Sequence, residues 1–155
     1  MALAGNSLAG FLLAVAILVT VHELGHYLAA RWCGVRVLRF SVGFGPVLFR
    51  WTGRRGIFAG TEFAVSALPL GGYVRMLDTR DPEPVAVHSD WTEAFDRQPL
   101  WKRSTIVAAG PIANFLLAFV LYAAALAVPD RGLAPLVAAP DPDTPAYAAG
   151  VRGGM

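Results

Sequence analysis

Residues 20–29 read TVHELGHYLA and place two histidines and a glutamate at the end of an apolar run, residues 8–21. His22 and His26 are four positions apart, so on a helix their imidazoles lie on one face and can share a metal ion. Glu23 can reach a water on that metal as general base without being a ligand. Zinc suits this spacing, because it takes tetrahedral nitrogen or oxygen ligands and keeps one position for water. The stretch therefore predicts a zinc-binding HExxH helix.

Composition favours a membrane protein. Of 155 residues, 55% are hydrophobic and only 15% are charged. Eleven of the 13 Lys and Arg lie in residues 31–103, between two apolar segments. That region has no lysine-rich run or RNA-binding signature, so we expect no nucleic-acid partner. The single cysteine, Cys33, excludes an intramolecular disulfide.

Two apolar segments predict an α-helical polytopic membrane protein. Residues 1–33 and 104–128 each supply more than the ~20 residues that a spanning helix needs. No Lys or Arg precedes the first segment, so we expect a retained helix and not a signal peptide. The positive-inside rule then places residues 34–103 in the cytoplasm and both the N-terminus and the segment after the second helix outside it. The basic residues nearest the helix ends are Arg31, Arg36, Arg39, Arg97, Lys102 and Arg103.

The region between these helices divides into two parts. Residues 34–78 alternate in β-rich runs separated by glycines, which predicts a membrane-associated β-hairpin region. An edge strand there could pair with an unwound substrate, or the hairpin could merely shield the site from lipid. Residues 79–103 are polar and contain proline, and we expect a cytoplasmic loop with one short helical turn near residues 91–95.

Ionisable residues on a membrane helix cost about 2.5–3.5 kcal/mol each by insertion scales, so they usually serve a function. The alternative is that His22, Glu23 and His26 sit at the wetted helix end and have no role.

Three blocks of the sequence, residues 22–46, 61–78 and 94–118, resemble the site-2 proteases, and among them the bacterial regulator of sigma-E protease group. The resemblance implies that His22 and His26 bind Zn²⁺, that Glu23 activates water, and that a re-entrant loop surrounds residues 43–46. It also implies a third zinc ligand, an aspartate in an LDG motif on a later helix.

The sequence contains no LDG motif. Four other residues are candidate substitute ligands, although we expect their loop to be a solvated connector: Asp78, Asp81, Glu83 and His88. Residues 129–155 resemble an extracytoplasmic segment leading into a truncated PDZ domain. We therefore expect the N-terminal part of a longer protein, or a truncated relative, that is inactive alone.

The resemblance thus implies a zinc endopeptidase of the bacterial inner membrane that cuts transmembrane segments of single-pass proteins, such as an anti-sigma factor. Asn114 is a candidate substrate-binding residue, although its amide could instead bridge two helices. The other candidate substrate-binding residues are Gly43, Gly45, Gly71 and Gly72. The competing functions are a pseudoprotease that binds membrane proteins, a metal transporter or sensor, and a PDZ adaptor.

Overall fold

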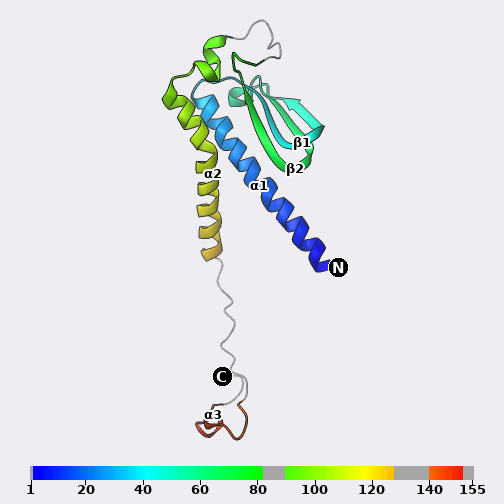
Figure 1. The fold of residues 1–155 in the computed structure, drawn as a ribbon, viewed down its shortest axis with the longest axis vertical. Helices are drawn as coiled ribbons and strands as arrows, with labels where there is room; N and C mark the ends of the chain where they lie inside the picture. Colours follow the sequence, from blue (N-terminus) through cyan, green and yellow to red (C-terminus); the bar gives the residue numbers. More distant parts are fainter. Residues whose placement is uncertain (1, 82–89, 128–139, 152–155) are drawn as a thin grey trace. The chain divides into compact units, whose positions relative to one another are not determined.

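The computed structural model describes residues 2–81, 90–127 and 140–151, with side chains from residue 7 onward. The chain forms two compact units, Met1–Leu121 and Tyr122–Met155. The first unit contains the long helix α1, a β-sheet and most of the second long helix α2 (Figure 1).

Helix α1 spans Ala2–Trp32 and ends in a Schellman motif. Gly34 adopts a φ of +78°, which favours glycine, and its N–H donates to the carbonyl of Arg31 at 3.2 Å. The N–H of Val35 donates to the carbonyl of Ala30 at 2.8 Å. The Lys102 ammonium satisfies the carbonyl of Cys33 at 2.8 Å. These contacts turn the chain sharply from α1 into the sheet.

Two long antiparallel strands form the sheet, β1 (Val37–Thr52) and β2 (Glu62–Met76). Register shifts let the same part of β1 pair twice, so that Phe40 lies opposite both Val74 and Phe63. Residues 47–52 of β1 pair again with residues 62–66 of β2. Residues 72–76 of β2 have strand partners on one side only within the described chain, so they form an edge of the sheet.

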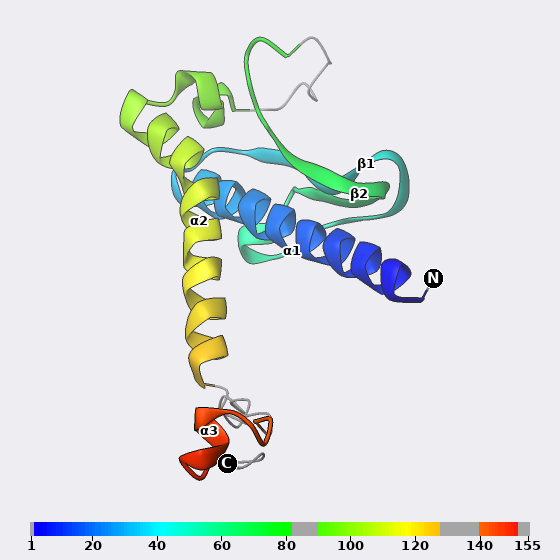
Figure 2. The same ribbon diagram turned by 60° about the horizontal axis from the view of Figure 1, so that its bottom comes forward.

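An aromatic cluster fixes the sheet to the last turns of α1. Tyr27 is fully buried, and its ring packs edge-on against Phe40 and Phe63 with centroids 5.7 Å apart in both pairs. Its hydroxyl donates to the carbonyl of Ile57 at 2.6 Å, in the 3₁₀ turn η1 (Gly56–Phe58) between the strands. Figure 2 shows the strands lying along this part of α1.

The connector after β2 is partly helical and hydrogen-bonds back to the start and the end of the sheet region. It contains two 3₁₀ turns, η2 (Trp91–Glu93) and η3 (Phe95–Arg97), where we predicted one helical turn. The N–H of Phe95 donates to the carbonyl of Leu77 at 2.7 Å, which ties η3 to the end of the sheet. The polar residues 82–89, including the candidate ligands Glu83 and His88, lie outside the described residues.

Helix α2 spans Leu100–Ala127 and continues through Pro111. It begins four residues before the predicted residue 104, and α1 and α2 are both long and apolar enough to cross a membrane. Large apolar side chains on both helices face outward, among them Phe11 and Phe115, which are 61% and 77% exposed. The prediction of two candidate membrane helices around an antiparallel hairpin is therefore confirmed.

The second unit contains the short helix α3 (Pro145–Ala148), capped by the hydroxyl of Thr144. Residues 128–139 and 152–155 lie outside the described part of the chain. The predicted start of a PDZ domain stays a prediction.

Candidate metal centre

Helices α1 and α2 come into backbone contact where each presents a glycine. A Cβ on Gly25 would lie 2.8 Å from Cβ of Ala113, and one on Gly110 would lie 2.8 Å from Nε2 of His22. Side chains larger than hydrogen do not fit at these positions without displacing a neighbour. The two glycines therefore let the imidazoles of α1 rest directly on the backbone of α2.

The two imidazoles point one nitrogen each at a shared position. Nε2 of His22 and Nε2 of His26 are 3.2 Å apart, and the ring planes are nearly perpendicular at 84°. Two tetrahedral zinc ligands at about 2.0–2.1 Å from the metal would be roughly 3.3 Å apart, so the pair fits two of zinc's four positions. Among the described residues, no group of three or more His, Cys, Asp or Glu could hold a metal ion. The chain's described part thus offers half of a zinc ligand set.

Helix α2 holds the opposite nitrogen of each ring. Nδ1 of His26 is 2.7 Å from the carbonyl oxygen of Ile106, and Nδ1 of His22 is 3.2 Å from Nδ2 of Asn114. A carbonyl oxygen only accepts, so His26 must donate from Nδ1 and keep the lone pair of its neutral ring on Nε2. That arrangement is the one a metal ligand needs.

Glu23 lies beside this pair and against the sheet. A Cβ on Gly72 would lie 2.9 Å from Cγ of Glu23, so the missing side chain at this point of β2 makes room for the carboxylate. Glu23 and His26 line a cavity of about 330 Å³ together with Val74 and Met76 of the sheet edge. The glutamate, one imidazole and the free strand edge thus meet in one space.

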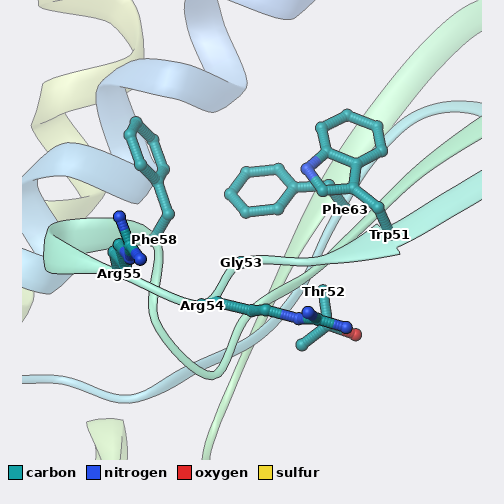
Figure 3. A pocket seen from close by; sticks show the side chains of 7 residues that line it. All are labelled: Trp51, Thr52, Gly53, Arg54, Arg55, Phe58 and Phe63. Atoms are coloured by element: carbon teal, nitrogen blue, oxygen red, sulfur yellow. The ribbon is translucent and has the colours of Figure 1, made fainter.

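A second cavity reaches the pair from the α2 side. It measures about 360 Å³ and is lined by His22, Asn114, Pro111, Phe115 and Ala118. A third and larger hollow of about 540 Å³ lies elsewhere, between the end of β1, η1 and Phe63. Figure 3 shows its aromatic rings, with Arg54 and Arg55 at its margin. Neither His22 nor His26 lines this third hollow, so it is not part of the metal centre.

The chain matches a known protein family and several named relatives. The family model described as peptidase family M50 matches residues 10–148. The chain belongs to this family. It is 52% identical over 146 residues to a protein of Ralstonia nicotianae whose name marks it as a candidate zinc metalloprotease. It is 45% identical to "Protease RseP" of Yersinia pestis and 43% identical to "Regulator of sigma-E protease RseP" of Salmonella typhimurium.

These matches cover 92–96% of this chain but only 31–32% of each relative. The chain therefore spans about a third of the length of the curated relatives it matches.

The loop carboxylates considered as substitute ligands have other partners. Asp78 accepts from Arg80 at 2.6 Å, and this hydrogen bond lowers the pKa of Asp78 to about 2. Asp81 accepts from Arg75 at 2.8 Å. Asp78 does line the cavity that holds Glu23 and His26, but its carboxylate already accepts hydrogen bonds from the guanidinium of Arg80. The structure therefore gives these two residues a role in ordering the connector.

The four glycines predicted to bind substrate lie at the bends of the two strands. Gly43 and Gly45 have φ of +88° and +83°, and Gly43 is packed so closely that a Cβ would lie 2.8 Å from the carbonyl oxygen of Ser66. A Cβ on Gly71 would press on the ring of Phe44. Only Gly72 of the four contacts a residue of the metal centre, namely Glu23. The geometry explains why glycine stands at these positions, and their binding of substrate stays a prediction.

Sequence patterns did not indicate two parts of the site, the carbonyl of Ile106 and the close approach at Gly25 and Gly110. Every residue type has a backbone carbonyl, so the sequence does not show which carbonyl will accept a hydrogen bond from a histidine. Small residues facing each other in two apolar helices, such as Gly25 with Ala109 and Ala113, are a recognisable signal of close helix packing.

Replacing Gly110 by Ala tests the close approach. Alanine is the better helix former by about 0.8–1.0 kcal/mol, but its methyl group would meet both imidazoles. We expect Gly110→Ala to weaken zinc binding by about 10-fold or more, since displaced ligands and outer contacts cost that much. Zinc affinity is measured by competition with a chromophoric chelator in the purified full-length protein.

The matched control is Gly10→Ala on α1, where a Cβ would meet nothing within 4 Å. This variant should bind zinc as the unmodified protein does. Equal zinc affinity in both variants would contradict the description of the helix crossing.

Proposed function

We propose that this chain holds zinc on His22 and His26 and contributes that site to an endopeptidase that cuts peptide bonds within the membrane. The observation that carries the proposal is the convergence of the two Nε2 atoms, 3.2 Å apart, on a helix apolar enough to span a membrane. His26 lies six residues, about 9 Å, before the end of α1 at Trp32, inside the span and not at its tip. Membership of family M50 and the names of the relatives support it.

The carboxylate of Glu23 is the proposed general base. It shares a cavity with His26, so a water in that cavity lies within its reach. Glu23 would take the proton of that water at a carboxylate oxygen and later give it to the leaving nitrogen of the cut bond. Zinc bound to the two imidazoles would acidify water and polarise the scissile carbonyl. The long apolar faces of α1 and α2 would keep other water away from the bond.

The sheet edge next to Glu23 suits an extended substrate. Residues 72–76 have strand partners on one side only within the described chain, and Val74 and Met76 line the cavity that contains Glu23. A helical substrate has its backbone hydrogen bonds closed, so it must unwind before attack, and an unwound segment could pair with this edge. We infer that the substrate is a single-pass membrane protein, such as an anti-sigma factor, because relatives carry the name of a sigma-E regulator protease.

The remaining assignments belong to the same proposal. The host membrane is the bacterial inner membrane, residues 34–103 face the cytoplasm, and the segment after α2 leads into a PDZ domain outside it. The third zinc ligand is an aspartate outside the described residues, since the described residues contain no third ligand beside the two histidines.

Single substitutions in the full-length protein separate metal binding from chemistry. His22→Ala or His26→Ala should lower both zinc content and cleavage, because each removes a ligand. Glu23→Gln should leave zinc bound and reduce cleavage of a model single-pass membrane protein by at least about 100-fold, the lower range for a general base. Zinc is measured by elemental analysis and cleavage by gel electrophoresis of the purified proteins.

Glu93→Gln, in η2, is the matched control and should retain both properties. Full cleavage by purified Glu23→Gln would overturn the proposed mechanism. Zinc binding with no cleavage by the unmodified protein would favour a pseudoprotease or a metal sensor instead.

The orientation is tested by cysteine labelling in intact cells. The background is Cys33→Ala, which removes the single native thiol. A membrane-impermeant maleimide should label cysteines placed near Met1 or after Pro129, and should label one at Arg54 only after the membrane is opened, because the basic residues stay inside. The reverse labelling pattern would contradict the orientation.

A further inference from the structure

The hollow of about 540 Å³ at the end of β1 has firmly held walls. The rings of Trp51 and Phe63 stack with centroids 5.2 Å apart. A Cβ on Gly53 would collide with the backbone of Phe58, so the two sides of the turn touch directly. The N–H of Gly53 also donates to the carbonyl of Thr61 at 2.9 Å, which ties the turn to the start of β2. The hollow is therefore part of the folded sheet and does not depend on a ligand to form.

Two arginines at the margin of this hollow have no partner in the described part of the chain. Arg54 and Arg55 are exposed, and no described residue gives either guanidinium a hydrogen bond or an ion pair. Glu62 is the single acidic residue in positions 24–77, and it already pairs with Arg39 at 3.0 Å. The positive charge at the hollow is thus available to an anion from outside the sheet.

The hollow lies near the end of a membrane-spanning helix. Residues 7–32 of α1 extend about 39 Å, against about 30 Å of hydrocarbon, so one end of the span reaches the headgroups. Arg31 and the exposed Trp32 are residues that suit the headgroup level. Phe58 stacks on Tyr27, which lies five residues, about 7.5 Å, before Trp32. The hollow, which Phe58 lines, therefore lies close to the boundary between acyl chains and headgroups.

The register of the sheet separates this hollow from the site proposed for the substrate. Val74 pairs with Phe40, Phe40 with Phe63, and Phe63 with Trp51. Three strand spacings, about 14 Å, thus lie between the edge that borders the cavity of Glu23 and the edge that borders the hollow. A substrate strand paired with the first edge does not reach the second, so the hollow needs a different occupant.

The lining of the hollow matches the two parts of a phospholipid. The rings of Trp51, Phe58 and Phe63 gather on one side of the turn that carries Arg54 and Arg55 (Figure 3). Aromatic rings pack against the glycerol and the first acyl carbons at this depth, and a guanidinium binds phosphate oxygens through two parallel hydrogen bonds. A lipid with net negative charge is favoured over a zwitterionic one, because the arginines lack an acidic neighbour.

We propose that this hollow binds the headgroup of an anionic phospholipid, with its phosphate on Arg54 or Arg55 and its glycerol against Trp51 and Phe58. The inference does not depend on the zinc site and requires only that α1 crosses the membrane. A lipid bound here fixes the height of one edge of the sheet in the membrane. The rigid sheet then transmits that height to the opposite edge beside Glu23.

Photocrosslinking of the full-length protein identifies the occupant. Phe49 is replaced by benzoylphenylalanine, because its ring is 62% exposed and lies 5.5 Å from that of Trp51. The protein is placed in nanodiscs with equal parts of phosphatidylglycerol and phosphatidylcholine, and the adducts are identified by mass spectrometry after irradiation. Phosphatidylglycerol should predominate over phosphatidylcholine. Equal amounts of the two lipids would overturn the inference, and so would adducts to another segment of the protein alone.

Substitution of the arginines tests the charge. Arg54→Gln and Arg55→Gln should each lower the ratio of phosphatidylglycerol to phosphatidylcholine adducts by about 5-fold, the usual effect of one basic residue near an anionic surface. Arg54→Lys keeps the charge and should retain most of the ratio. The matched control is Arg97→Gln in η3, which removes the same charge from an exposed residue outside the hollow. An equal fall in Arg97→Gln would show a general surface effect and overturn the inference.

Inorganic phosphate distinguishes a lipid site from a site for a free anion. Excess phosphate, compared with chloride at the same ionic strength, should leave the phosphatidylglycerol adduct unchanged, because free phosphate offers nothing to the aromatic walls. Displacement of the lipid by phosphate would overturn the proposal of a lipid site. Zinc takes no part in these measurements, so they can fail while the proposed function stands.

Discussion

The close approach of α1 and α2 at Gly25 and Gly110 is the constraint on which the metal centre depends. Hydrogen in place of a side chain lets two imidazoles fit between the helices, with one nitrogen of each ring on α2 and the other facing its neighbour. A two-histidine site on a single isolated helix would leave both rings free to rotate. Here the second helix fixes their orientation, which is what a preorganised site needs.

The sheet positions the surroundings of Glu23. Tyr27, the residue directly after His26, anchors it through aromatic packing and a hydrogen bond to Ile57. The consequence is that Gly72 lies against Glu23 and that an open strand edge borders the same cavity as the carboxylate. Neighbouring residues on α1 point in different directions around the helix. The two imidazoles therefore face α2, Glu23 faces the sheet, and Tyr27 packs into the core.

Local patterns in the sequence were enough to predict the two apolar helices and the β-rich region between them. The spacing of His22 and His26 likewise predicted that their rings share a face. Sequence could not show that Phe40 pairs with both Val74 and Phe63, because that double register depends on how the strands bend. Nor could it show the carbonyl of Ile106 on His26, 80 residues away, since every residue has a carbonyl. Asn114 was recognisable as a polar group in an apolar helix, but its partner was not.

The central claim is that His22 and His26 together bind one zinc ion through their Nε2 atoms. X-ray absorption at the zinc edge of the metal-loaded full-length protein tests it most directly. The account predicts two imidazole nitrogens at about 2.0–2.1 Å with the remaining positions filled by oxygen, and one fewer imidazole in His22→Ala. Zinc surrounded by oxygen alone, or an unchanged imidazole signal in that variant, would contradict it.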